Sequence, residues 1–279
     1  MIPARFDYEV AESPEHALEL LGSREDAKAL AGGHSLIPAL KLRIARPALL
    51  VDIGRLDGLA GVRDAGEQIA IGALTRHAAL ARDPLLQAHC PVVSHAAALV
   101  GDPQVRHRGT IGGSLAHGDP ASDLPAVVLA LGAELVVRGK GGERVVPAAD
   151  FFRGVFETAV GTGELLTEIR VPKLAGAGWS YLKFRRRAAD WATVGVVAVL
   201  GRDNGTVTSA AVALVNMGGT PLRAAGTEAA LVGGSSAADA AASIADGTQP
   251  PGDPGASGEF RAHLARVVGR RAIEEALAR

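Results

Sequence analysis

Two short segments of this chain each combine a pair of glycines with a serine and lie between apolar runs. The first is Gly32-Gly33-His34-Ser35, and the second is Gly112-Gly113-Ser114. Glycine pairs permit positive φ angles and bring successive backbone N–H groups to one concave side of the chain, where they bind phosphate without a lysine. We therefore predict that the two segments together hold a diphosphate, with further donors from the hydroxyls of Ser35, Thr110 and Ser114.

A simpler interpretation of the same segments is that both are tight turns, in which glycine is common. Two segments of matching chemistry weaken that alternative. Neither segment is a familiar nucleotide motif, because the dinucleotide fingerprint needs Gly-x-Gly-x-x-Gly after a strand and the phosphate loop needs Gly-Lys-Ser/Thr at its end. The sequence therefore argues against a Rossmann domain and against an ATPase.

The size and charge of the chain limit its architecture and its partners. At 279 residues it is longer than a typical domain of about 100–150 residues, so two compact units are expected. The net charge is -1 and no long basic run is present, which argues against binding to nucleic acid. The triplet Arg185-Arg186-Arg187 is too short for that function, and we interpret it as a surface or interface cluster.

The few residues suited to metal or nucleophilic chemistry form no recognisable pattern. Cys90 is the only cysteine, so the chain holds neither an internal disulfide nor an iron–sulfur cluster of its own, and a small buried thiol is expected there. The eight histidines show no metal spacing, and no Ser-His-Asp set is evident, so we predict no catalytic residue and no metal ligand. The start lacks the apolar core of a signal peptide, and no apolar window reaches about 18 residues. We expect a soluble, cytoplasmic protein without stable membrane insertion.

Periodicity and turn signals predict an N-terminal α/β unit and a larger second unit. In the first unit, Ser13 caps a helix that ends near Gly22. In the second unit, Thr75 caps a helix through Leu86, which Asp83-Pro84 disturbs. Strands are expected at 27–31, 48–53, 68–72, 134–138, 144–146 and 165–171, and further helices at 96–100 and 125–131.

The composition of 174–178 is typical of a linker, and we place a domain boundary there. Beyond it, Asp203-Asn204-Gly205 is a turn signal between two strands. The expected strands are 179–185, 194–200 and 207–215, and the expected helices are 221–231, 237–245 and 259–278. Strands followed by helices indicate a C-terminal α+β unit.

The neighbours of the two glycine segments carry a resemblance to a known family. Ala31-Gly-Gly-His-Ser35 is followed by Pro38-Ala-Leu-Lys41, and Arg106-His-Arg-Gly-Thr-Ile-Gly-Gly-Ser114 is followed by Asp119-Pro-Ala-Ser-Asp-Leu-Pro125. These stretches resemble the two flavin loops of the FAD-binding medium subunit of molybdenum hydroxylases, the carbon monoxide dehydrogenase and xanthine dehydrogenase family. The resemblance extends over nearly the whole chain. Near the C-terminus, Phe260 stands where the family more often has tyrosine.

The resemblance implies an α+β fold with a two-lobed FAD-binding domain of the PCMH, or vanillyl-alcohol-oxidase-like, type. That domain would span 1–175, with lobes at about 1–57 and 58–175, and a carbon monoxide dehydrogenase flavoprotein-like domain would span 176–279. The residues it implies for FAD binding lie in both glycine segments and at six further positions. They are Ala29, Leu30, Ala31, Gly32, Gly33, His34, Ser35, Leu36, Val100, Thr110, Ile111, Gly112, Gly113, Ser114, Asp123, Leu166, Lys183, Asp190 and Trp191.

Several of these positions also have an ordinary structural interpretation. Asp123 suits a helix N-cap, a role that is compatible with a hydrogen bond to the cofactor. Val100 and Leu166 fit a hydrophobic core, and Trp191 fits either a core or a stacking contact with the flavin ring. The family places a lysine at the position of Lys183, where a cation near the ring favours the anionic reduced form.

The function implied by the resemblance is electron transfer within a larger enzyme. Partners would be a large subunit with the molybdenum cofactor and a small subunit with two-iron two-sulfur clusters, arranged as a dimer of heterotrimers. Electrons would pass through the clusters to FAD and then to an external acceptor. One alternative is a self-contained flavin oxidase, in which His34 is linked covalently to the flavin, and another is a non-catalytic nucleotide-binding module.

Overall fold

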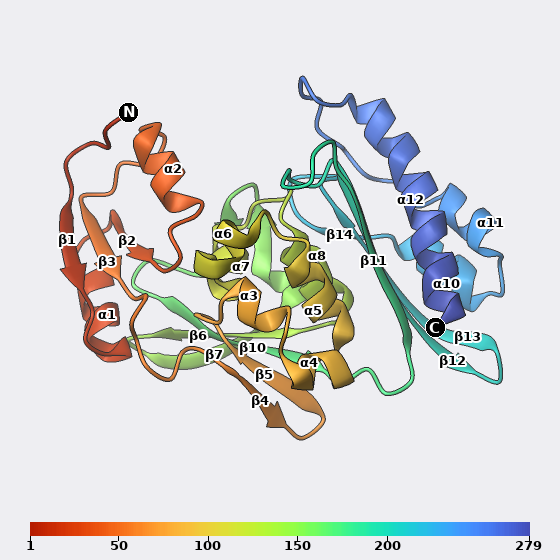
Figure 1. The fold of residues 1–279 in the computed structure, drawn as a ribbon, viewed down its shortest axis with the longest axis horizontal. Coiled ribbons are helices and arrows are strands. Elements are labelled where there is room, and N and C mark those ends of the chain that lie inside the picture. The colour runs from red at the N-terminus through yellow and green to blue at the C-terminus, as the bar shows by residue number, and fades with distance from the viewer.

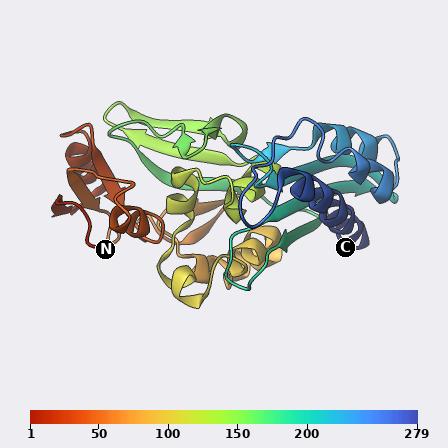
Figure 2. The same ribbon diagram turned by 90° about the horizontal axis from the view of Figure 1, so that it is seen from above.

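Three structural units follow one another along the chain and lie in a row (Figures 1 and 2). The computed structural model describes all residues 1–279. Each unit is built around its own sheet: one of three strands, one of five strands and one of four strands. The fold is a mixture of helices and sheets, with a two-lobed domain followed by a smaller C-terminal domain, as the sequence predicted.

The first lobe is a small parallel sheet with helices beside it. Its strand order is β1-β3-β2, and both pairings are parallel, so each connection crosses over. The predicted cap at Ser13 is confirmed, because its hydroxyl accepts a hydrogen bond from the N–H of His16 at 3.0 Å. The elements are β1 (Asp7–Val10), α1 (Pro14–Leu21), β2 (Ala27–Leu30), α2 (Leu36–Lys41) and β3 (Leu49–Asp52).

The second lobe is an antiparallel sheet of five strands with helices packed on one face. The order is β4-β5-β10-β6-β7, so the central strand β10 arrives last along the chain. The strands are β4 (Val62–Ala65), β5 (Gln68–Gly72), β6 (Glu134–Gly139), β7 (Gly142–Pro147) and β10 (Leu165–Pro172), with a separate hairpin of β8 (Phe152–Gly154) and β9 (Glu157–Thr158). The helices are α3 (His77–Leu80), α4 (Pro84–His89), α5 (Pro91–Ala98), α6 (Pro103–Arg108), α7 (Ile111–His117), α8 (Asp123–Ala130) and α9 (Ala148–Phe151).

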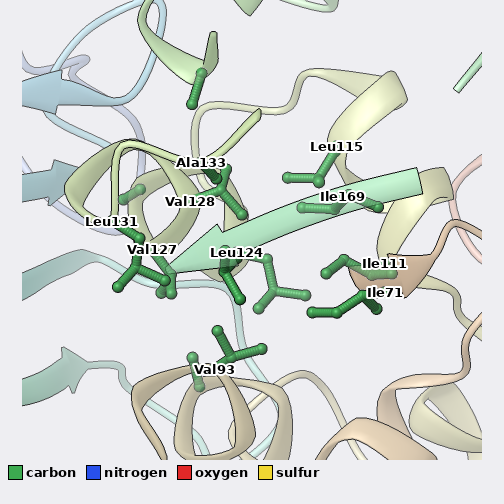
Figure 3. Close-up of a cluster of buried hydrophobic side chains, with 14 of the residues drawn as sticks. Ile71, Val93, Ile111, Leu115, Leu124, Val127, Val128, Leu131, Ala133 and Ile169 are labelled. Carbon is green, nitrogen blue, oxygen red and sulfur yellow. The ribbon is translucent and has the colours of Figure 1, made fainter. Parts of the chain in front are cut away.

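The core of the second lobe surrounds β10. Figure 3 shows Ile169 of that strand among Leu115, Leu124 and Ile71, which come from α7, α8 and β5. All of these side chains are fully buried, and every residue of α8 is buried as well. Helix α8 is therefore an internal helix, covered on more than one side.

The C-terminal sheet is buried on both faces, which explains why its strands are apolar without alternation. Along β12, Val197 belongs to the core of the second lobe, whereas its neighbours Val196 and Ala198 face the C-terminal helices. Helices α5 and α8 cover one face, and α10 and α12 cover the other (Figure 1). The elements are β11 (Gly178–Phe184), β12 (Val194–Asp203), β13 (Thr206–Val215), β14 (Leu222–Arg223), α10 (Ala225–Val232), α11 (Ala237–Ala242) and α12 (Gly258–Ala278).

Local turn and cap signals explain where the sequence predictions succeeded and failed. The hairpin turn between β12 and β13 is confirmed, with positive φ at Asn204 and Gly205. The single helix expected from Thr75 to Leu86 was wrong. The hydroxyl of Thr75 donates to the Gly72 carbonyl instead, and Asp83 caps the new helix α4 by accepting from Leu85 and Leu86 N–H at 3.0 Å. Similarly, the first expected C-terminal helix begins only at Ala225, because β14 pairs with β13.

The second glycine segment is helical, which corrects the prediction of positive φ angles there. Gly112 and Gly113 lie in α7, and neither has a positive φ. Gly112 is required for packing, because a Cβ at this position would lie 2.7 Å from the carbonyl oxygen of Ala73. Its neighbour Gly113 is exposed. Because Gly112 has no side chain, α7 packs directly on the backbone that follows β5.

We expect Gly112→Ala to destabilise the chain much more than Gly113→Ala does. The first substitution forces a methyl group onto Ala73, and overpacking of this kind costs about 1–3 kcal/mol. The second meets only the rotatable hydroxyl of Thr110 at 2.8 Å and gains about 1 kcal/mol of helix propensity. Urea unfolding of both variants measures the difference, and equal losses would contradict the packing role.

Candidate functional site

The first glycine segment presents a row of unpaired backbone donors. It connects β2 to α2, and Gly33 has a φ of 75°, a value that residues with a Cβ rarely adopt. The N–H groups from Gly32 to Leu36 donate to no acceptor within the chain. Five successive free donors beside the start of a helix suit an anionic ligand with several oxygens. The segment retains the anion-binding character predicted from its glycines.

His34 is the exposed residue of this segment. Its Nδ1 lies 3.0 Å from the carbonyl oxygen of Gly32, so the ring is turned back onto its own loop. Ser35 precedes α2 without using its hydroxyl as a cap. The hydroxyl therefore remains available to a ligand held by the N–H groups.

The second segment uses most of its N–H groups internally. Gly112 donates to Ala73 O at 2.8 Å, and Ile111 donates to Thr75 O at 3.0 Å. Gly113 donates to the capping hydroxyl of Thr110 at 3.1 Å. The prediction that the glycine N–H groups of this segment are free for a diphosphate is therefore wrong for both Gly112 and Gly113. The segment is instead the first part of helix α7, in which Ser114 is half-buried.

The first segment is in direct contact with Arg108 and Gly109, which lie just before the second segment and about 75 residues further along the chain. A Cβ at Gly32 would lie 2.9 Å from the Cα of Gly109 and would collide with the carbonyl oxygen of Arg108. The Arg76 guanidinium donates to the same carbonyl oxygen. Burial, followed by the repulsion of Arg108, lowers the pKa of Arg76 from its ordinary value. Arg76 thus adds a cation beside the contact, and no sequence motif marked it.

A buried charged pair joins the second lobe to the C-terminal sheet. The Lys183 ammonium lies 2.9 Å from Oδ2 of Asp123, and the two side chains are only 2% and 3% exposed. The Tyr181 hydroxyl donates to Oδ1 of the same carboxylate. Burial raises the pKa of Asp123 in spite of the neighbouring lysine, and burial together with this carboxylate raises the pKa of Tyr181 well above its ordinary value. The sequence singled out Asp123 and Lys183 separately, and the structure brings them together.

The predicted roles of these two residues need one correction. Asp123 is the first residue of α8, and Ser122 is the N-cap, so the expected cap at Asp123 is wrong. Lys183 also donates to the carbonyl oxygen of Leu99 at 3.3 Å. Because Val100 follows Leu99 directly, three of the predicted site residues lie around one junction.

The remaining predicted residues differ in their surroundings. Leu166 lies in β10 and is buried in the core of the second lobe, as its structural interpretation suggested. Asp190 and Trp191 lie on the loop between β11 and β12. The Trp191 side chain is 55% exposed, so the alternative of a core tryptophan is wrong.

His77 lies under the second segment and was not marked by the sequence. The backbone N–H of His77 donates to Gly109 O at 3.0 Å, and the imidazole ring packs against the Cα of that glycine. Burial, and then the positive charges of Arg106 and Arg76 and of His34, lower its pKa to about 4. Its Nδ1 is buried without a hydrogen-bond partner.

Two classes of site are absent from the fold. No cluster of three or more histidine, cysteine or carboxylate side chains is arranged to bind a metal ion. None of the helices combines the length and the apolar character needed to cross a bilayer. Cys90 is buried, and burial raises the pKa of its thiol to about 12, which fits the inert role expected for it.

Comparisons with known proteins agree with this arrangement of lobes and segments. Residues 4–174 match the FAD binding domain in molybdopterin dehydrogenase, and residues 179–276 match the CO dehydrogenase flavoprotein C-terminal domain. The chain therefore belongs to the family of FAD-binding medium subunits of molybdenum hydroxylases, and its cofactor is FAD.

Relatives and solved structures cover the full length of the chain. The carbon monoxide dehydrogenase medium chain of Hydrogenophaga pseudoflava is 42% identical over 100% of this chain and 99% of the relative. The 6-hydroxypseudooxynicotine dehydrogenase complex subunit alpha of Paenarthrobacter nicotinovorans is 41% identical over 100% of this chain and 97% of the relative. A structure of the Hydrogenophaga pseudoflava enzyme lacking the Mo-pyranopterin moiety superposes with a TM-score of 0.97 at 43% identity, covering 100% and 99% of the two chains.

The donors of the first segment fit the chemistry of FAD. The diphosphate of FAD carries several anionic oxygens, and free backbone N–H groups such as those from Gly32 to Leu36 can donate to oxygens of this kind. Gly32 cannot carry a side chain, because Arg108 and Gly109 occupy that space. The same contact aligns the donor row beside the second lobe.

We expect Lys183→Met to destabilise the chain by about 3–5 kcal/mol, because it leaves the Asp123 carboxylate buried without its cation. Arg24→Met is the matched control. It removes the pair of Arg24 and Asp7, whose side chains are 47% and 54% exposed, and such pairs contribute about 0–1 kcal/mol. Urea unfolding at neutral pH provides the comparison. Similar small losses in both variants would show that the buried pair does not hold the two units together.

We expect His77 to make the chain sensitive to acid between about pH 6.5 and pH 4. In that window the unfolded chain binds a proton at this position and the folded chain does not, so the free energy of unfolding falls as the pH falls. The full loss is about 3 kcal/mol at about 1.4 kcal/mol for each pH unit. Unfolding of His77→Gln measured at pH 7 and at pH 5 should show a smaller difference than in the parent chain. An unchanged difference would assign the acid sensitivity to other groups.

Proposed function

We propose that FAD binds at the contact of the two glycine segments, with its diphosphate on the N–H groups from Gly32 to Leu36. The observation that carries this proposal is the row of free donors beside the second segment. Thr110, the N-cap of α7, and Ser114 within α7 would supply hydroxyls. The remaining predicted residues would contact other parts of the cofactor, from the two lobes and from the loop between β11 and β12: Ala29, Leu30, Ala31, Val100, Ile111, Leu166, Asp190 and Trp191.

We further propose that Lys183 supplies the positive charge beside the flavin ring. Its ammonium is buried and held by Asp123 at 2.9 Å and by Leu99 O at 3.3 Å, so it keeps one position. When bound, FAD accepts electrons and passes them on, and a fixed cation near the ring stabilises negative charge that develops there. Asp123 holds the lysine, and the Tyr181 hydroxyl holds Asp123.

We propose that the chain transfers electrons within a larger enzyme. With one cysteine and no metal cluster site, it has no centre other than FAD to receive electrons from a substrate. The relatives are named as medium chains or subunits of dehydrogenases, which supports a partner subunit with two-iron two-sulfur clusters and a large subunit with the molybdenum cofactor. Electrons would enter FAD from the clusters and leave to an external acceptor, within a dimer of heterotrimers.

The substrate of such an enzyme would be selected by another subunit. Two relatives of nearly equal identity, 42% and 41%, are named for carbon monoxide and for 6-hydroxypseudooxynicotine. Because this chain is about equally similar to both relatives, its sequence favours neither substrate. We also propose that the residues up to about 175 bind FAD and that the residues after 175 support the FAD site.

The test is purification of the native protein from its own source. We expect two further polypeptides to co-purify, one with iron–sulfur absorbance and one with molybdenum, while the chain expressed alone turns over no aldehyde, purine or carbon monoxide. Acid precipitation should release all FAD into the supernatant, because no residue of the first segment needs to be linked to it. Colour retained in the pellet would indicate a covalent link through His34. A native particle of this chain alone with substrate turnover would support the self-contained oxidase instead.

A further inference from the structure

The loop between β11 and β12 holds an exposed tryptophan on a fixed backbone. Trp191 is 55% exposed, whereas Ala192 next to it is buried. The N–H of Thr193 donates to Phe184 O at 2.9 Å and closes the loop. A large apolar ring costs free energy when it faces water. The exposed ring of Trp191 is therefore accessible to a ligand.

Asn216 at the end of β13 ties this loop to the second lobe. Its side-chain Nδ2 donates to Ala192 O at 2.7 Å, and its backbone N–H donates to Pro120 O at 2.9 Å. Its φ is 62°, in the left-handed region that asparagine tolerates better than most residues. That conformation lets the side chain and the N–H of one residue reach two separate segments.

The two segments held by Asn216 both belong to the proposed FAD site. Pro120 lies in the connection from α7 to α8, between Ser114 and Asp123. Ala192 directly follows Trp191. Asn216 of the C-terminal domain thus links the loop that carries Trp191 to the connection that follows the second segment. Removing Nδ2 would leave the buried Ala192 backbone without its donor and free the loop to move.

We propose that Asn216 is a positioning residue of the FAD site, which acts by holding Trp191 against the bound flavin. The inference rests on the proposed function, because it requires Trp191 to touch the cofactor. The side chain of Asn216 donates to Ala192 O, next to Trp191, whereas its bond to Pro120 O comes from the backbone N–H. We therefore expect the loss of the side chain to act on FAD through Trp191.

The first experiment compares Asn216→Gly with Asn204→Gly in the purified native assembly. Glycine keeps the positive φ and the backbone N–H at both positions, so only the side chain is lost. Asn204 also has a positive φ, of 50°, but lies in the exposed turn between β12 and β13. After dilution, the rise of free-flavin fluorescence gives the rate of FAD release. We expect FAD release to be about tenfold faster from Asn216→Gly, because this variant loses one hydrogen bond and leaves a carbonyl unpaired. We expect the rate to be unchanged in Asn204→Gly. Equal rates in the two variants would overturn the inference.

The second experiment is a double-mutant cycle with Trp191→Ala. If Asn216 acts through Trp191, the double variant should release FAD about as fast as Trp191→Ala alone. If the two effects multiply, Asn216 acts independently, and the inference fails while the proposed FAD site stands. If Trp191→Ala releases FAD at the parent rate, Trp191 does not contact the cofactor. That result would overturn both the inference and this part of the proposed function.

Discussion

The backbone contact of Gly32 with the residues just before the second glycine segment is the constraint on which the proposed FAD site depends. Gly32 packs against Arg108 and Gly109 so closely that no side chain fits between them. This contact joins the parallel sheet of the first lobe to the helices of the second lobe. It also fixes Gly32, at the start of the row of free N–H groups, against Arg108 and Gly109, which directly precede Thr110. A diphosphate bound there would therefore meet donors in a fixed arrangement and would not have to order the loop itself.

The C-terminal domain packs closely against the second lobe, because its sheet completes the core of that lobe. Alternate residues of β12 face the two sides, and helices α5 and α8 close one of them. On that side, Lys183 and Tyr181 reach Asp123, and Asn216 reaches Pro120 and Ala192. Because these polar groups are buried, leaving any of them without a hydrogen-bond partner would cost free energy. The C-terminal domain thereby holds charged and aromatic groups at the proposed site without carrying a glycine segment of its own.

Signals that act within a few residues were predictive here. The Ser13 cap and the Asn204-Gly205 turn depend on short-range backbone geometry, and both lie where the sequence predicted them. Thr75 carries the same chemistry as a cap, but its hydroxyl is taken by the Gly72 carbonyl and by Gly61 from another segment. Gly112 looked like a loop glycine for a similar reason, since its helical packing on Ala73 involves a residue almost forty positions away. Both errors arose where a tertiary contact replaced the local preference.

The sequence by itself determined the family and the cofactor and marked the segments that we propose for the site, because glycine pairs and their flanking residues form short local motifs. It also marked Asp123, Lys183 and Trp191, although only as separate positions along the chain. The tertiary structure alone decided that Lys183 and Asp123 form one buried pair, that Trp191 faces outward, and that Arg76, His77, Tyr181 and Asn216 make the contacts described above around the proposed site. The physical reason is that burial and hydrogen-bond partners depend on segments that lie far apart in the sequence, 60 positions in the case of Lys183 and Asp123, which no local pattern encodes.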